Sequence, residues 1–340
     1  MLRMGSFLDV EKIEKRVRAA NYLTVAQLFL KDNFLMRRKL TSDDIKPRLL
    51  GHWGTCPGIN LAYACLHEYY IKDKNFHFVL GPGHGFPALQ ANLFIDKDLF
   101  RVDHNAAHTE LGIAYICRNF SWPNGFPSHS SPVTPGVLCE GGELGYALAT
   151  AYGYSLGHPE RTTAVLIGDG ELETATALSS LNLNKILSGS KNGKVLPILH
   201  LNGYKISAPT ISGRKSSHEL AEMLRGFGFT PLWVEAKKSK DDMLEQPSDT
   251  KALITSFGTA LEKADAAFEK NEHPFIILKS EKGASGPEEI NGKKIAGSQN
   301  AHQIPLPNAK TDPTELEALE NWLSSYNFSE LFNTLQGFTL

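Results

Sequence analysis

Apolar and polar positions along the chain form blocks that predict short strands between amphipathic helices. Over residues 9–30 the apolar side chains recur at spacings of three and four, the period of a helix. Compact apolar runs follow, typical of strands buried on both faces. We expect these strands at residues 76–80, 162–167, 195–202, 231–235 and 274–279, and helices from near Pro57 and Ser217 and over 143–157, 171–188 and 255–270. Such alternation predicts an α/β fold, a doubly wound, mostly parallel sheet with helices on both faces.

Three stretches depart from this alternation. Pro197 interrupts the third apolar run and argues against an unbroken ladder there, because proline has no N–H to donate. Residues 118–142 hold four prolines and predict a long loop, which in a compact chain is usually functional or disordered. Residues 283–310 are polar and irregular. A helix over 314–326 follows, with Thr311 or Asp312 as its cap. We therefore expect one domain over residues 1–310 and a helix with a linker-like tail over 311–340.

Composition and charge exclude several classes of protein. The chain has 340 residues, 41% hydrophobic and 21% charged, as in ordinary globular proteins. Its net charge of −2 implies no general attraction to nucleic acid or to a membrane. No apolar stretch suits a signal peptide or a membrane span. The four cysteines form no CxxC pair and are too few for a disulfide framework. These features predict a cytoplasmic protein.

Candidate chemistry begins where the second strand ends. Asp169 lies between two glycines, which permit a sharp turn. Asn202 ends the next strand, 33 residues later (202 − 169). Because ligands bind beyond the carboxyl ends of parallel strands, we expect these two oxygen donors to meet there. Oxygen ligands suit Mg²⁺ or Ca²⁺, and Mg²⁺ often bridges protein oxygens and phosphates. The chain has no P-loop, and GPGHGF at 81–86 lacks the spacing of the dinucleotide fingerprint.

The stretch GDG followed by LNGY resembles the metal–diphosphate motif of thiamine diphosphate enzymes. More specifically, the chain resembles the N-terminal, diphosphate-binding domain of phosphoketolases over about residues 20–335. The stretches that carry the resemblance are LGHWGTCPGINLAYACL, LGPGHGFPAL, PNGFPSHSSPVTPG, EGGELGYAL, GDGELET, VLPILHLNGYKI, LRGFGFTPLWVE and AHQIPL. Such a resemblance implies thiamine diphosphate and a divalent cation, Mg²⁺ or Ca²⁺, as cofactors.

The resemblance also implies a set of cofactor-binding positions. Asp169 and Asn202 would bind the metal through their side chains, and Tyr204 through its carbonyl. The residues expected to line the diphosphate, or to lie close to the cofactor, are Gly142, Glu143, Gly168, Gly170 and Glu171.

Five further positions match the catalytic residues of the family: His52, His84, His129, His302 and Lys282. Cleavage of a ketose removes a proton from a hydroxyl, and loss of water from the two-carbon adduct needs a proton donor. Imidazoles can serve both steps. Of the other histidines, we interpret His67, His77, His158 and His273 as surface or capping residues, and leave His104, His108, His200 and His218 undecided.

In phosphoketolases the cofactor lies between this domain and a second one, which holds the aminopyrimidine and donates a glutamate. This chain carries no such domain, so the resemblance implies half a site. We expect a separate pyrimidine-binding chain to complete it, as a heterotetramer, and the start Met favours a split subunit over a fragment. The reaction implied is cleavage of xylulose 5-phosphate or fructose 6-phosphate by inorganic phosphate, giving acetyl phosphate and an aldose phosphate.

Several positions depart from the family pattern and keep two alternatives open. Phe86 stands where the family usually has glycine, Ala284 where it has tryptophan, and Ala175–Thr176 where it has Gly-Pro. We interpret Phe86 as narrowing a loop beside the site and Ala284 as emptying a place there. A thiamine diphosphate-dependent lyase or acyl transferase on another donor is the first alternative. The second is a non-catalytic paralogue with a structural or regulatory role, against which the retained histidines argue.

Overall fold

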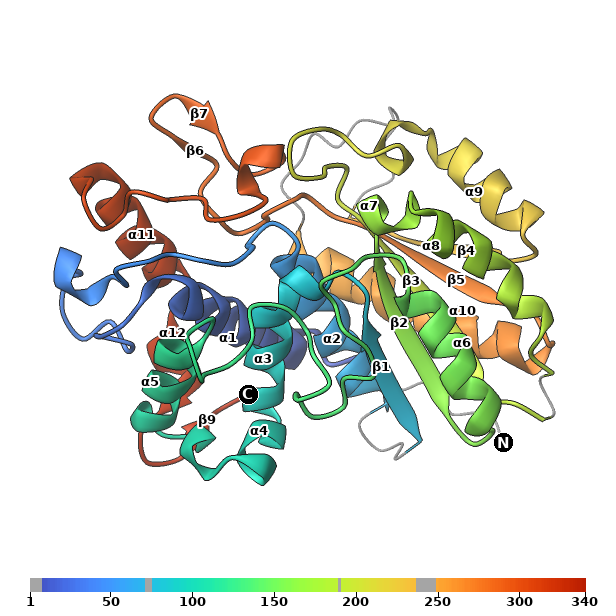
Figure 1. The fold of residues 1–340 in the computed structure, drawn as a ribbon, viewed down its shortest axis with the longest axis horizontal. Coiled ribbons are helices and arrows are strands. Elements are labelled where there is room, and N and C mark those ends of the chain that lie inside the picture. Colours follow the sequence, from blue (N-terminus) through green and yellow to red (C-terminus); the bar gives the residue numbers. More distant parts are fainter. Residues whose placement is uncertain (1–7, 71–74, 189–190, 237–248) are drawn as a thin grey trace.

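The computed structural model contains a five-stranded sheet that is parallel throughout, and it confirms the predicted α/β fold (Figure 1). It describes residues 8–70, 75–188, 191–236 and 249–340. The strands lie in the order β1-β2-β3-β5-β4. Their bounds are Phe76–Leu80 (β1), Thr162–Gly168 (β2), Lys194–Leu201 (β3), Thr230–Val234 (β4) and Pro274–Lys279 (β5). All five agree with the predicted strands to within one residue at either end.

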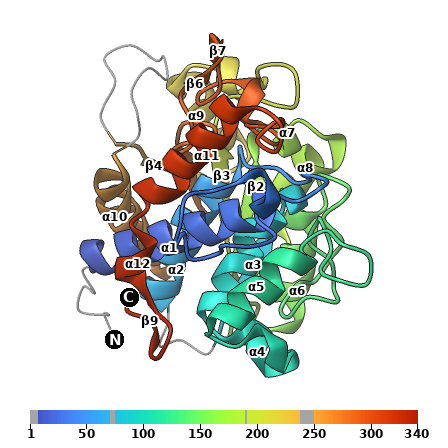
Figure 2. The ribbon, with the colours of Figure 1, turned by 90° about the vertical axis from the view of Figure 1, so that its left-hand side faces the viewer.

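Helices cover both faces of the sheet, as Figures 1 and 2 show. One core joins the sheet to α1, α2, α3 and α10, and a second core lies under α6 and α9. The helices are α1 (Val10–Phe29), α2 (Cys56–Tyr70), α3 (Phe86–Ile95), α4 (Asp98–Val102), α5 (Glu110–Asn119), α6 (Ala147–Gly157), α7 (Asp169–Leu172), α8 (Ala175–Ser180), α9 (Ser217–Gly226), α10 (Thr250–Glu269), α11 (Pro313–Ser325) and α12 (Phe328–Leu331). No helix in the described ranges is long and apolar enough to cross a membrane.

Local chemistry explains where the predictions were wrong. The single helix expected over 171–188 is broken into α7, α8 and a 3-10 turn, because Thr174 accepts a hydrogen bond from Ala177 and caps a new helix. Helix α6 begins at Ala147 instead of residue 143, since Gly145 has a φ of +104° that no helix allows. Pro197 does lie inside β3. Pairing of β3 with β5 begins only at Ile198, so at Pro197 the strand is paired on one side.

The segment 118–142 contains no named helix or strand after α5 ends at Asn119, which confirms the predicted long loop. Helices α3, α4 and α5 were not predicted. Short antiparallel pairs also add to the expected elements: Glu289–Ile290 (β6) with Lys293–Lys294 (β7), and Phe332–Asn333 (β8) with Gly337–Phe338 (β9).

Helix α11 packs within the main core. Asp312 caps it by accepting from the N–H of Thr314, and its Trp322 ring lies 4.8 Å from the ring of Trp53 in an edge-to-face contact. The division at residue 310 stays a prediction.

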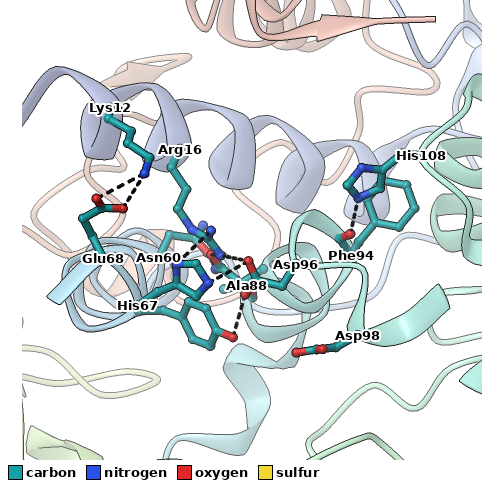
Figure 3. A network of polar contacts seen from close by, with 12 residues as sticks. Lys12, Arg16, Asn60, His67, Glu68, Ala88, Phe94, Asp96, Asp98 and His108 are labelled. Carbon is teal, nitrogen blue, oxygen red and sulfur yellow. Dashed lines mark hydrogen bonds and ion pairs between the residues drawn. The ribbon is translucent and has the colours of Figure 1, made fainter. Parts of the chain in front are cut away.

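A buried polar network ties α1, α2 and α3 together (Figure 3). The Arg16 guanidinium lies 2.7 Å from the Asp96 carboxylate, which also accepts from the Tyr63 hydroxyl at 2.9 Å. His67 contacts both members, with Nδ1 3.3 Å from Arg16 and Nε2 3.2 Å from Asp96. We call this set, Arg16, Tyr63, His67 and Asp96, the Arg16 network.

Candidate active site at the carboxyl end of the sheet

Asp169 begins α7 directly after β2, and its carboxylate is almost fully buried. One oxygen accepts from the N–H of Gly170 at 2.9 Å. The other accepts from the N–H groups of Asn202 and Gly203, at 3.1 and 2.6 Å, and from the Thr210 hydroxyl at 3.1 Å. Burial raises the pKa of Asp169 to about 6, and these hydrogen bonds oppose that rise. The carboxylate thus fastens the end of β2 to the turn after β3, as the spacing predicts.

Asn202, Tyr204 and Lys282 surround this carboxylate. The side-chain oxygen of Asn202 accepts from the N–H of Tyr204 at 3.2 Å. The Tyr204 carbonyl accepts from the Lys282 ammonium at 2.8 Å. Lys282 is 2% exposed, and burial lowers its pKa to about 8 although Asp169 nearby favours its charge. The three residues expected to bind a metal are therefore linked by hydrogen bonds beside a buried cation.

This oxygen set fits a hard divalent cation. A carboxylate, an amide oxygen and a backbone carbonyl are the donor types that Mg²⁺ and Ca²⁺ take. Among the described residues, no group of three or more His, Cys, Asp or Glu side chains could hold a metal. A metal here would therefore depend on the amide and carbonyl oxygens of Asn202 and Tyr204.

The remaining cofactor positions fall into two groups. The Glu171 carboxylate is buried and accepts from the N–H groups of Gly168 and Gly145, at 3.1 and 3.2 Å, while burial raises its pKa to about 7. It packs so closely on Gly81 that a Cβ there would lie 2.2 Å from a carboxylate oxygen. In contrast, Gly142 and Glu143 are exposed. Contact of any of these residues with a diphosphate stays a prediction.

Four histidines from four separate segments meet beside Lys282. His52 precedes α2, His84 follows β1, His129 lies in the long loop, and His302 lies before α11. His52 is central, with its ring centroid 5.0, 5.5 and 5.3 Å from those of His84, His129 and His302, and His84 lies 5.2 Å from His302. We call these residues the histidine cluster. The structure thus brings all five predicted catalytic residues together.

Burial sets the charge state of the histidine cluster. It lowers the pKa of His52 to about 4 and that of His302 to about 3, with Lys282 and the neighbouring imidazoles adding repulsion. Burial is also the main cause that lowers the pKa values of His84 and His129. The rings are therefore neutral near pH 7. In His52 and His302 the Nδ1 atom is buried and has no hydrogen-bond partner. A buried polar atom without a partner destabilises the fold unless a ligand or water forms a hydrogen bond with it.

Sequence reasoning missed three residues that position the site. Thr210 bonds Asp169, and Ser128 lies 2.9 Å from Nδ1 of His129. His200, left undecided, is fully buried, with its ring nitrogens 3.3 Å from the Thr55 hydroxyl and 2.9 Å from the Ser280 hydroxyl. Its place inside β3, next to the expected metal ligand, was the one available signal.

The other histidines lie away from the cluster. His158 caps α6 through the Tyr154 carbonyl at 2.7 Å, which confirms a capping role. His67 belongs to the Arg16 network, so its interpretation as a surface or capping residue was incomplete. His77 and His273 are partly buried beside Tyr154 and Phe229. His108 contacts the Phe94 carbonyl, and His104 and His218 are exposed.

Of the departures from the family pattern, Phe86 is fully buried in the main core and stacks on Phe120. The interpretation that Phe86 narrows a loop beside the site stays a prediction. Ala284 is half-buried, two residues after Lys282.

Comparisons with known proteins show the family of the chain. The family model described as the XFP N-terminal domain matches residues 6–339. A probable phosphoketolase of Bradyrhizobium diazoefficiens is 43% identical over 329 residues, covering 96% of this chain and 41% of the relative. The chain belongs to the phosphoketolase family. A second probable phosphoketolase, from Mesorhizobium japonicum, is 42% identical over 330 residues. The match covers 96% of this chain and 41% of that relative. The chain thus spans about two fifths of the length of these relatives.

Solved structures place the fold among transketolases. A transketolase variant from Pichia stipitis aligns with a TM-score of 0.60 at 15% identity, covering 94% of this chain and 44% of that one. The transketolase of Campylobacter jejuni aligns with a TM-score of 0.58 at 16% identity, covering 90% and 43%. Both support a thiamine diphosphate-binding α/β fold for this phosphoketolase-family domain. They carry no argument about its reaction.

Proposed function

We propose that the chain is the diphosphate-binding half of a phosphoketolase-like enzyme. It would cleave xylulose 5-phosphate or fructose 6-phosphate with inorganic phosphate, giving acetyl phosphate and an aldose phosphate. The observation that carries this proposal is the meeting of the histidine cluster, Lys282 and the Asp169–Asn202 pair at one end of the sheet. The assignment to the cytoplasm stays a prediction.

Asp169, Asn202 and the Tyr204 carbonyl would hold Mg²⁺ or Ca²⁺ against the diphosphate of thiamine diphosphate. When bound, that cofactor supplies a carbanion and an electron sink for cleavage of the carbon–carbon bond. The chain's own part is to orient it. The buried Nδ1 atoms of His52 and His302, which have no hydrogen-bond partner, support the binding of another polar group beside them.

The histidine cluster would manage the protons. A neutral imidazole can accept a proton from a substrate hydroxyl at one nitrogen and donate from the other. His52, which contacts all three other rings, is placed to exchange protons between donor and product hydroxyls. Lys282 would attract the anionic groups of substrate and cofactor. Binding of anions there favours protonation of the rings and moves their low pKa values toward neutrality.

A separate pyrimidine-binding chain would complete the site, as a heterotetramer. The proposal is supported by the share of the relatives that this chain leaves uncovered, 59% (100 − 41) for the Bradyrhizobium protein.

Affinity purification of the tagged chain from its own cells, with mass spectrometry, tests the proposal. We expect a pyrimidine-domain polypeptide to co-purify and the complex to form acetyl phosphate only with thiamine diphosphate and Mg²⁺. His302→Asn should reduce the rate at least about a hundredfold, as loss of a proton-transfer group does. The matched control, His104→Asn at an exposed position, should leave the rate of acetyl phosphate formation unaltered. A purified chain that alone turns over xylulose 5-phosphate would refute the two-chain proposal.

A different donor substrate is the second candidate, favoured by Ala284 beside Lys282. A complex that binds the cofactor but cleaves neither sugar phosphate, and accepts another α-hydroxyketone or α-keto acid, would replace the first proposal with this one.

A further inference from the structure

The outer edge of β1 has backbone groups without partners. The N–H of Gly81 donates to Leu166 of β2, and the carbonyl of Asn75 accepts from Thr162. Because successive residues of a strand point their backbone groups to opposite sides, Phe78 and Leu80 direct theirs away from β2. In the described part of the chain, no hydrogen bond reaches the N–H or carbonyl of either residue.

A cavity of about 930 Å³ runs along the edge, lined by all five residues of β1, by residues 135–139 and by α2, α3 and α4. Leu80 is only 6% exposed. An edge strand presents a row of unpaired N–H and C=O groups with which another strand can pair, so the outer edge of β1 offers a template for one more strand.

The cavity, which we call the β1 slot, lies between two walls. Residues of α2 and α3 line one side. Residues 135–139 line the other, and Gly141 of the same loop packs against Gly83. Tyr63, His67 and Asp96 of the Arg16 network also line the slot.

Both walls of the β1 slot are mainly apolar, although Asp96, Lys97, Asp98 and Arg101 also line it. Tyr63, Leu66 and Leu93 lie on the helical wall, and Val137 and Leu138 on the other. A strand inserted between them must therefore be apolar on both faces, like a buried parallel strand. A small ligand would fit the volume but would leave a row of strand donors and acceptors unmatched.

We propose that the β1 slot receives an extended, continuously apolar segment of the partner polypeptide, about five residues long, which adds a sixth strand beside β1. The source of the strand rests on the proposed function, whereas the strand addition itself does not. The partner is favoured as its source because the relatives hold most of their length outside the matched region.

Amide hydrogen exchange measured by NMR tests this directly. In the free chain, the amides of Phe78 and Leu80 should exchange faster than those of Val79 and Gly81, which face β2. In the purified complex, we expect Phe78 and Leu80 to slow at least about tenfold while Val79 and Gly81 stay unchanged. Unaltered exchange in an active complex would overturn the strand addition and leave the proposed function standing. Slowing in the free chain that grows with its concentration would assign the slot to a second copy, against the proposal.

A tethered probe keeps the test independent of the partner. Cys139 lines the β1 slot and is half-buried, whereas the other three cysteines are buried, so a disulfide-linked peptide attaches there. The probe is a blocked hexapeptide with four valine or isoleucine residues, and its control carries N-methyl groups on alternate amides. The plain peptide should slow exchange at Phe78 and Leu80, and the N-methylated one should not. Equal exchange with both peptides overturns strand addition.

A pair of variants separates the slot from the rest of the surface. Leu138→Asp places a charge in the slot wall and should weaken complex formation at least about tenfold. Leu111→Asp, at an 81% exposed position on α5, makes the same change away from the slot and should have no effect. Equal affinities of the two variants, both folded by thermal unfolding, would contradict the proposal.

Discussion

Two buried clusters of the molecule contain histidine, and they differ in how completely they are paired. In the Arg16 network both ring nitrogens of His67 have partners, Arg16 at 3.3 Å and Asp96 at 3.2 Å (Figure 3). In the histidine cluster the rings pack against one another, and the Nδ1 atoms of His52 and His302 have none.

This difference indicates a structural role for the Arg16 network and a ligand-binding role for the histidine cluster. The Arg16 network joins three helices and pairs the Arg16 guanidinium with the Asp96 carboxylate, although the buried Nε of Arg16 has no hydrogen-bond partner. The histidine cluster stores unsatisfied hydrogen-bonding capacity beside oxygen donors and a buried lysine, which costs stability in the free chain. Native proteins keep unpaired buried polar atoms mainly where a bound ligand forms the missing hydrogen bonds. The cluster is therefore the candidate site.

The largest effect should come from breaking the paired cluster. Asp96→Ala leaves the Arg16 guanidinium buried without its carboxylate, and we expect unfolding free energy to fall by about 3–5 kcal/mol in urea titration. Asp98→Ala, which removes a half-buried carboxylate paired with the exposed Arg101, should cost no more than about 1 kcal/mol. Similar losses in both variants would show that the network is not a structural centre.

The next largest effect should come from removing one of the residues expected to bind the metal. Asp169→Asn removes the charge expected to face the metal, so affinity for thiamine diphosphate in Mg²⁺, measured calorimetrically on the complex, should fall at least about tenfold. Asp98→Asn, at the other end of the sheet, is the matched control. An unchanged affinity in Asp169→Asn would remove Asp169 from the metal site.

The histidine cluster should also make stability depend on pH. The folded pKa of His52 is about 4 against 6.5 for an ordinary histidine, so between these values the unfolded chain binds the proton first. Unfolding free energy should therefore fall as the pH is lowered from about 6.5 to about 4, with His84, His129, His302 and Lys282 adding repulsion. Between about pH 6.5 and pH 4, the unfolding free energy of His52→Gln should fall less than that of the parent protein. Parallel curves of unfolding free energy against pH would contradict the lowered pKa of His52.

The smallest effect concerns the turn after β3. Glu173 accepts from Lys205 at 2.5 Å and from the N–H of Ile211, which holds residues 203–214 over α7. Because this pair is partly exposed, Glu173→Gln should cost less than about 1 kcal/mol. Amide exchange at Ile211 should nevertheless accelerate. No change at Ile211 would mean that other contacts hold the turn.

Sequence patterns predicted the sheet well because its buried strands are continuous apolar runs. They failed where a single side chain redirects the backbone, as Thr174 does between α7 and α8. Helix α3 was missed because it is buried all round and shows no polar stripe.

The candidate site divides in the same way. The meeting of Asp169 and Asn202 follows from the geometry of parallel strands, and the structure shows it. The histidine cluster was predictable only through resemblance to phosphoketolases, since its members come from segments up to 250 residues apart (302 − 52). No local signal marked Thr210, whose hydroxyl contacts Asp169 across a turn.

The most direct test is imidazole ¹⁵N NMR of the complex, with and without thiamine diphosphate and Mg²⁺. The account predicts that His52 and His302 stay neutral down to about pH 5 in the free state, and that their Nδ1 signals shift when the cofactor binds while those of His67 do not move. Ordinary titration of His52 and His302 near pH 6.5, or signals that ignore the cofactor, would contradict the claim that this cluster is left unpaired for a ligand.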